Sequence, residues 1–322
     1  MSKVILLTLL GVAMAGWWTP EQIHLSWTEN ENEMRATWVT LWWVPHTWVA
    51  YRPILCDTDQ TEFKFIEGEK NVFDAGDDIS HNIWIHTSVM TDIRPECSYE
   101  YYVGMTWLWS DTYYFAGLTP DYNKPYEQLD LLTKVLVFGD WGIGPIGTDT
   151  MDLLYKHSKL RTFDAILHIG DMGYDLHDFN GHVGDIFGRI KEPVAANFPY
   201  MTIPGNHEDH HNATAYKHRY LMPENYANNK TNTFYSFNLG LAHYVLIDTE
   251  INFDDDKVGA AQTQWNWLVD DLKKANEERD IRPWLIVASH HPLYCSVNWR
   301  LPLMPFDFAN LKSNGDCGQD SL

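Results

Sequence analysis

The sequence of 322 residues predicts an all-β sandwich followed by a layered α/β domain. Two features of the chain predict this order. Up to about residue 120, short apolar runs alternate with polar turns, which is typical of β-strands. Beyond residue 130, apolar runs of strand length alternate with segments of helical periodicity, which predicts helices packed on a sheet. A chain of this length can form two domains with a proper core.

The composition indicates a packed globular protein. Hydrophobic residues make up 45% of the chain, and 15 Trp and 17 Tyr argue against disorder. The net charge of −21 argues against a nucleic-acid partner, because nucleic-acid affinity depends on clustered Lys and Arg. The same charge does not attract anionic substrates from a distance. A phosphate-binding site would therefore need local positive charge, such as bound metal ions.

The first 15 residues have the pattern of a secretion signal. Lys3 supplies a positive charge, residues 4–12 form an apolar core, and residues 13–15 form a small-x-small cleavage site. The core is too short to span a bilayer, and an ordinary buried strand is the alternative. Two Asn-x-Thr sequons, at Asn212 and Asn229, are candidate glycosylation sites. We therefore expect a secreted, extracellular or lysosomal-type luminal protein that is free of the membrane after signal cleavage.

Secretion makes the four cysteines candidates for two disulfides. Cys295 and Cys317 lie close together near the end of the chain, whereas Cys56 and Cys97 both lie in its N-terminal part. The economical pairing is therefore Cys295 with Cys317 and Cys56 with Cys97. The other pairings remain open on the sequence alone.

Residues 16–121 are predicted to form the β-sandwich, and residues 122–130 a polar linker. The stretch 93–99 looks like a tyrosine corner, in which the hydroxyl of Tyr99 bonds to the backbone. This part resembles a fibronectin type III domain, with a structural role. Its histidines, His24, His46, His81 and His86, are expected to be sandwich or surface residues. The predicted strands are residues 22–27, 34–42, 48–52, 82–91, 99–105 and 112–115.

Residues 131–322 are predicted to form the α/β domain. A hairpin of residues 234–239 and 242–248 turns on Gly240. The helix expected at 148–158 has Asp149 and Asp152 near its positive N-terminal end. The other predicted helices are residues 187–197 and 260–277, and the other strands are residues 134–138, 165–169, 200–203 and 284–289.

Four of these strands end in a polar motif. Because the carboxyl ends of parallel strands meet at one edge of a sheet, Asp140, Asp171, Asn206 and His290 should converge there. An Asp or Asn after glycine can instead cap the next helix, but three in order are hard to explain that way. Oxygen and imidazole donors together predict a metal site. The motifs are Gly139-Asp140-Trp141-Gly142, Gly170-Asp171-Met172-Gly173-Tyr174, Gly205-Asn206-His207-Glu208 and Val287-Ala288-Ser289-His290.

These motifs resemble those of the calcineurin-like metallophosphoesterases, and Tyr174 narrows the resemblance to purple acid phosphatases, with motifs GDxG, GDxxY, GNH(E/D), VxxH and GHxH. The resemblance implies that Asp171 bridges two metal ions. Asp140 and Tyr174 would bind the first ion, and Asn206 and His290 the second. It further implies Fe(III) in the first position, with a purple colour from its phenolate ligand, and a divalent Fe, Zn or Mn ion in the second.

The implied activity is hydrolysis of small phosphate monoesters at acid pH, by a hydroxide activated at the Fe(III)–M(II) centre. His207 would be the catalytic proton or hydrogen-bond donor and would contact the substrate. His291 follows a ligand and could also contact the substrate, although strand alternation points it to the other face. His168 and His243 lie on predicted strands and are expected in the core.

The fifth motif, Gly-His-x-His, does not occur in the sequence. Residues 181–184 come closest, but they precede two other motifs and lack the second histidine. We therefore expect a metallophosphoesterase domain that is incomplete at its C-terminus, with one ligand fewer for each metal ion and a weaker metal affinity. The alternative function is that of a catalytically impaired, truncated isoform acting as a binding or non-enzymatic protein. A nucleotide phosphodiesterase or pyrophosphatase is disfavoured by Tyr174.

Overall fold

The computed structural model describes residues 16–56, 60–76, 78–94, 97–117, 133–224, 232–252 and 257–292. The predicted signal (1–15), the predicted linker (122–130), Asn229, Cys295 and Cys317 lie outside these residues. Among the described residues, no helix combines the length and the apolar character needed to cross a membrane.

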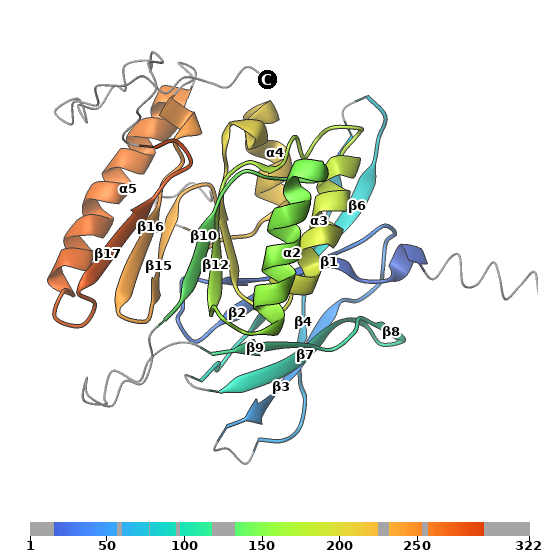
Figure 1. Ribbon diagram of the computed structural model, residues 1–322. Coiled ribbons are helices and arrows are strands. Elements are labelled where there is room, and N and C mark those ends of the chain that lie inside the picture. The colour runs from blue at the N-terminus through green and yellow to red at the C-terminus, as the bar shows by residue number, and fades with distance from the viewer. Residues whose placement is uncertain are drawn as a thin grey trace, which may run out of the picture.

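The N-terminal part is a sandwich of two antiparallel sheets, as predicted (Figure 1). All six predicted strands are present with slightly shifted ends, and β4, β5 and β8 are additional. One sheet has the order β1 (Glu21–Trp27), β2 (Met34–Thr40), β6 (Asn82–Met90), β5 (Glu69–Asp74). The other has the order β4 (Lys64–Glu67), β3 (Trp48–Leu55), β7 (Ser98–Met105), β8 (Leu108–Trp109), with β9 (Tyr113–Ala116) paired to β7.

One hydrogen bond and one disulfide, both predicted, stabilise the sandwich. The hydroxyl oxygen of Tyr99 accepts the backbone N–H of Arg94 at 2.7 Å, which confirms the tyrosine corner. Cys56 and Cys97 form a disulfide, as expected from their positions in the chain. Both features anchor the start of β7 against the preceding loop and β3.

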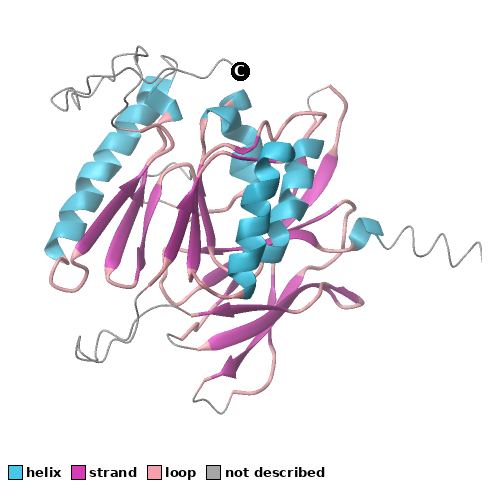
Figure 2. Cartoon of the chain, viewed as in Figure 1, coloured by secondary structure: helices cyan, strands magenta, loops and turns pink. Residues whose placement is uncertain are grey.

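The second part alternates strands and helices, as predicted (Figure 2). The strands β10 (Val135–Phe138), β12 (Ala165–Ile169) and β14 (Tyr200–Ile203) form a parallel sheet, and β11 (Trp141–Gly142) pairs with β13 (Met172–Gly173). A second sheet contains β15 (Tyr235–Leu239), β16 (Ala242–Leu246) and β17 (Trp284–Ala288). The helices are α2 (Pro145–Lys159), α3 (His182–Ala195), α4 (His210–Arg219) and α5 (Val258–Glu277), with short 3₁₀ helices η2 (Asn206–Glu208) and η3 (Glu250–Asn252).

The helix boundaries correct three expectations. α2 begins at Pro145, because proline suits the first helical position, so Asp149 and Asp152 lie beyond the first turn. α3 begins at His182 rather than at residue 187. α4 was not predicted, because its polar sequence has no apolar periodicity. In Figure 1, α2 and α3 lie side by side over β10 and β12, and α5 runs along the sheet that contains β17.

The two parts share one continuous core. β1 lies beside β14 through a parallel bridge between Leu25 and Pro199, and α3 packs on β1. The Tyr101 hydroxyl donates to the carbonyl oxygen of Ala196 at 2.6 Å. Glu192 accepts hydrogen bonds from the Tyr113 hydroxyl at 2.6 Å and from the backbone N–H of Gln22 in β1 at 2.5 Å. The sandwich therefore supports the α/β layer that carries the strand-end motifs.

Candidate metal centre

The structure brings the five predicted metal ligands together. Asp140, Asp171 and Asn206 follow β10, β12 and β14, and His290 follows β17. The Tyr174 hydroxyl donates to Asp140 Oδ1 at 3.0 Å. His290 Nε2 lies 3.1 Å from Asn206 Oδ1 and 3.4 Å from Asp171 Oδ1. The donors thus form two contacting groups at one edge, Tyr174 with Asp140 and His290 with Asn206 and Asp171.

The backbone of this edge takes conformations that non-glycine residues rarely adopt. Asp140, Asp171 and Tyr174 have φ values of 59°, 56° and 48°. Such left-handed positions outside glycine tend to cluster at functional sites. A Cβ atom at Gly205 would lie 2.3 Å from Asp171 Oδ1, and one at Gly170 would lie 2.6 Å from His290 Nδ1. Both glycines are therefore required for the close approach of the donors.

The hydrogen bonds of His290 orient it as a metal ligand. Its Nδ1 lies 2.8 Å from the carbonyl oxygen of Ile169, which can only accept, so Nδ1 carries a proton. In the neutral ring, Nε2 then presents a lone pair towards the oxygens of Asn206 and Asp171. A cation between these atoms removes the repulsion among three acceptors. The donor set present therefore fits bound metal ions.

The pKa shifts at the site have the same cause. Burial, followed by the charges of Asp140 and Asp171, raises the pKa of Tyr174, so the phenol keeps its proton and donates to Asp140. Burial also raises the pKa of Asp171, although His290 and His207 oppose this shift. Without a cation the site disfavours its own negative charges. A bound cation would favour the phenolate and the carboxylates.

Glu208 is a site residue whose role the sequence did not reveal. It is 2% exposed, and its carboxylate accepts three backbone N–H groups. The donors are Asp171 at 2.8 Å, Met172 at 2.8 Å and Gly205 at 2.9 Å. The side chain therefore joins the loop after β12 to the loop after β14. Its place in the third motif was the only signal in the sequence.

His207 lies at this edge but is held by a residue outside the ligand set. Its Nδ1 is 2.8 Å from Asp175 Oδ1, and its backbone N–H donates to Asp171 Oδ1 at 3.2 Å. Its Nε2 lies 4.0 Å from Asp171 Oδ2, and its ring packs against Tyr174 with centroids 4.4 Å apart. Asp175 follows Tyr174 directly, yet nothing in the sequence pairs it with a histidine 32 residues later.

His291 contacts Glu250, which lies in the short 3₁₀ helix η3. Its Nε2 lies 3.0 Å from Glu250 Oε1 on η3. Burial lowers the pKa of His291, but the hydrogen bond and charge of Glu250, together with the charges of Asp171 and Asp140, raise it overall. His291 therefore interacts electrostatically with the site carboxylates, and its contact with substrate stays a prediction.

Of the two histidines expected in the core, His168 is buried there, whereas His243 is only half-buried and borders a cavity. His168 is fully buried, with Nδ1 at 2.5 Å from the Tyr200 hydroxyl. His243 lies between Asn238 at 2.7 Å and Asp271 at 2.9 Å. Asn212 is exposed, so its sequon is accessible on the surface.

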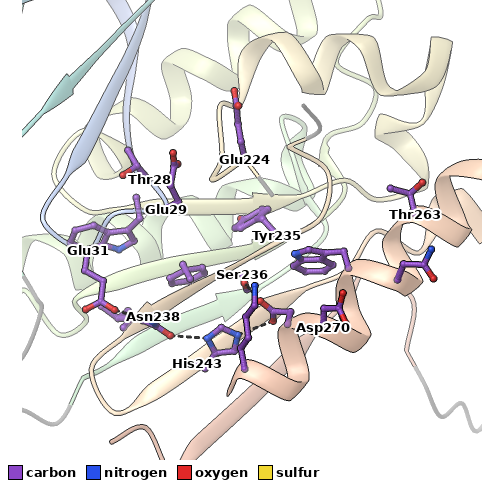
Figure 3. A pocket seen from close by; sticks show the side chains of 17 residues that line it. Thr28, Glu29, Glu31, Glu224, Tyr235, Ser236, Asn238, His243, Thr263 and Asp270 are labelled. Carbon is purple, nitrogen blue, oxygen red and sulfur yellow. Dashed lines mark hydrogen bonds and ion pairs between the residues drawn. The ribbon is translucent and has the colours of Figure 1, made fainter. Parts of the chain in front are cut away.

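A cavity of about 430 Å³ lies between the turn after β1, the strands β15 and β16, and α5 (Figure 3). None of the predicted metal ligands lines it. His243 and Lys274 line it together with five acidic side chains (Figure 3). These are Glu29, Glu31, Glu224, Asp270 and Asp271. Such a lining repels phosphate anions, so this cavity is a poor candidate for the phosphate-ester site.

Comparisons with known proteins identify the families of both parts of the fold. Residues 133–313 match the family model described as calcineurin-like phosphoesterase. Residues 20–116 match the model described as purple acid phosphatase, N-terminal domain. Together the two matches cover both parts of the fold.

Curated relatives include acid phosphatase type 7 of Mus musculus, which is 35% identical over 280 residues, or 86% of this chain and 60% of the relative. Its Homo sapiens counterpart is 34% identical, with the same coverage. Purple acid phosphatase 18 of Arabidopsis thaliana is 26% identical, covering 87% of this chain and 58% of the relative. This chain thus spans about 60% of the length of these three curated relatives.

Among solved structures, the fold is similar to that of purple acid phosphatase PPD1 from yellow lupin seeds. The TM-score is 0.69 and the sequence identity 22%, over 87% of this chain and 52% of that one. A structure of PhoD matches with a TM-score of 0.54 and 14% identity, over 87% of this chain and 63% of that one.

Proposed function

Since the chain belongs to the calcineurin-like phosphoesterase family and carries the N-terminal domain of purple acid phosphatases, we propose that it hydrolyses phosphate monoesters at a dinuclear metal centre. The observation that supports this most is the convergence of Asp140, Asp171, Tyr174, Asn206 and His290 from four strand ends. The curated relatives named acid phosphatases support the same reaction.

The residues present divide into two donor sets around Asp171. Asp140 and Tyr174 would hold one ion, and Asn206 and His290 the other, with Asp171 between them. A phenolate donor suits a trivalent ion such as Fe(III), and an amide with an imidazole suits divalent Fe, Zn or Mn. When bound, such ions activate water for attack on phosphorus and neutralise the phosphate oxygens.

His207 is proposed to donate the proton to the leaving alcohol. Asp175 accepts a hydrogen bond from Nδ1, which fixes the orientation of the ring. Nε2, on the opposite side of the ring, is then free to donate into the site. His291, whose pKa is raised in part by its contact with Glu250, is proposed to bind a phosphate oxygen.

The remaining proposals concern the environment of the protein. We propose secretion or residence in an acidic lumen, glycosylation at Asn212 and Asn229, and a second disulfide between Cys295 and Cys317. The Cys56–Cys97 disulfide is consistent with such an oxidising compartment.

The test is metal content and turnover of the 322-residue chain itself. The secreted protein would be purified without chelators, analysed for metals, and assayed for phosphate release from an aryl phosphate ester at acid pH. We expect at least two metal ions per chain, and turnover that falls on Asp171→Asn but not on His46→Asn, an exposed histidine of the sandwich. A metal-free, inactive but folded chain would refute the proposal and favour a non-enzymatic binding role.

A further inference from the structure

Three possible metal ligands meet where the sandwich touches α3. His81 lies in the turn between β5 and β6, and His182 and Asp185 lie in the first turn of α3. One ligand atom from each lies within 4.8 Å of the others. None of the three belongs to the proposed dinuclear centre. His81 was expected to be an ordinary sandwich or surface histidine, and its position against Asp185 alters that interpretation.

The distances suit a small tetrahedral ion. His81 Nε2 lies 2.7 Å from Asp185 Oδ2, and His182 Nδ1 lies 4.0 Å from the same oxygen. The two imidazole centroids are 4.3 Å apart. Ligand atoms bound at about 2.0 Å to a tetrahedral Zn(II) lie roughly 3.3 Å from one another, which is between the two observed distances. Small side-chain movements would therefore complete the geometry.

The carboxylate is already oriented for this role. Asp185 is 1% exposed, and its Oδ1 is occupied by Arg219 at 2.9 Å and by Gln22 at 3.3 Å. Oδ2 is left facing the two histidines. Partners that fix one oxygen of a ligating carboxylate, so that the other can bind the ion, are a general feature of metal sites.

The backbone around the cluster also holds the two domains together. Asn180 Oδ1 accepts the backbone N–H groups of Asp78 at 3.0 Å and Ile79 at 3.2 Å. Gly181, with φ of +80°, packs so closely that an added Cβ would lie 2.4 Å from the carbonyl oxygen of Ala75. These contacts fix the β5–β6 turn, which carries His81, against the start of α3, which carries His182 and Asp185.

We propose that His81, His182 and Asp185 bind one Zn(II) ion that links the β-sandwich to α3. Two imidazoles and one carboxylate suit zinc better than Mg²⁺ or Ca²⁺, which prefer oxygen ligands. The His182 side chain is 59% exposed, so water can reach the ion and complete its coordination. Arg219 neutralises part of the carboxylate charge, and we expect a weaker affinity than an unpaired Asp would give. This site does not depend on the proposed phosphatase activity.

The test compares zinc bound by the full chain and by two single variants. After removal of metals, each protein is dialysed against buffered zinc and analysed for zinc content and thermal unfolding. We expect His182→Asn to bind one zinc ion fewer than the parent and to lose part of the zinc-dependent rise in Tm. The matched control His46→Asn, another exposed histidine, should behave like the parent.

Equal zinc content in His182→Asn and the parent would overturn the proposal, as would an equal loss in His46→Asn. Because a variant could lose zinc simply by misfolding, a second measurement uses the unsubstituted chain. Zinc should protect His81 and His182, but not His46, from modification by diethyl pyrocarbonate, read by peptide mass spectrometry. Modification of His182 that is unaffected by zinc would also overturn the proposal.

Discussion

The carboxylate of Glu208 accepts the backbone N–H of Asp171 at 2.8 Å, across 37 residues of sequence. The same carboxylate accepts the N–H groups of Met172 and Gly205. Asp171 is the proposed bridging ligand, and Gly205 precedes the proposed ligand Asn206. One buried side chain therefore sets the relative position of two ligand loops.

Glu208→Gln should weaken both the fold and the metal centre. The amide group of Gln turns a donor towards backbone donors, so at least one buried N–H loses its acceptor, at a cost of about 1–3 kcal/mol. We expect a lower free energy of unfolding in urea and a lower metal content. Glu277→Gln, on the exposed side of α5, is the control. An unchanged metal content in Glu208→Gln would contradict the proposed positioning role.

His207→Asn should lower kcat by about 10²–10⁴, the range typical of a lost general acid. The loss should be greater for an alkyl phosphate than for an aryl phosphate, because a poor leaving group depends more on protonation. Steady-state rates on both ester types measure this difference. Equal losses on the two esters would argue against proton donation by His207.

Asp175→Asn should have a smaller effect in the same direction. Asn lacks the negative charge of the carboxylate that accepts a hydrogen bond from His207 Nδ1, so the ring should be held less firmly in place. We expect a modest fall in kcat that, as for His207→Asn, is greater for an alkyl phosphate than for an aryl phosphate. Steady-state rates on both ester types measure it, and an equal loss on the two esters would indicate a general loss of structure instead.

Tyr174→Phe tests the proposed Fe(III) position. Removal of the hydroxyl deletes the phenolate donor and its hydrogen bond to Asp140, while the ring can still pack against His207. We expect the loss of any visible absorption band and a lower iron content, with little change in circular dichroism. Tyr114→Phe, at a tyrosine exposed on β9, should keep the band. A band that survives Tyr174→Phe would exclude phenolate coordination by this residue.

The sequence predicted those parts of the site that follow from topology. Asp140, Asp171 and Asn206 each follow a parallel strand, and such strand ends must meet at one edge. The partners of these residues could not be predicted in the same way. Glu208 and Asp171 are 37 residues apart, and His81 and Asp185 are 104 residues apart. Contacts at such separations depend on packing that no local pattern encodes.

The fold was predicted where apolar periodicity is strong. β4 and β5 were missed because they lie at sheet edges, where few side chains are buried and charged residues alternate with apolar ones. The early start of α3 was missed because Gly181 and Gly184 flank His182 and weaken the helical pattern. Gly184 is retained there because an added Cβ would lie 2.7 Å from Arg219 Nε.

Lys191 gives a prediction about pH and stability. It lies on α3 at 2% exposure, its Nζ has no hydrogen-bond partner among the described residues, and its nearest aromatic rings are those of Tyr200 and Tyr220. Burial lowers the pKa of Lys191 to about 7, with Glu192 opposing the shift and Arg219 adding to it. Between pH 7 and the ordinary lysine pKa, the unfolded chain binds a proton that the folded chain does not. This residue therefore makes the fold more stable as the pH rises through that range.

Lys191→Met should stabilise the protein most at and below pH 7, where the parent must bury a charge. Each pKa unit corresponds to about 1.4 kcal/mol, so the gain near neutral pH is on the order of a few kcal/mol. The gain should shrink steadily towards about pH 10, where lysine is neutral in both states. Urea unfolding of parent and variant at several pH values measures it, with Lys273→Met on the exposed face of α5 as the control. A gain that does not vary with pH would mean that the pKa of Lys191 is the same in the folded and the unfolded chain, and would contradict the prediction.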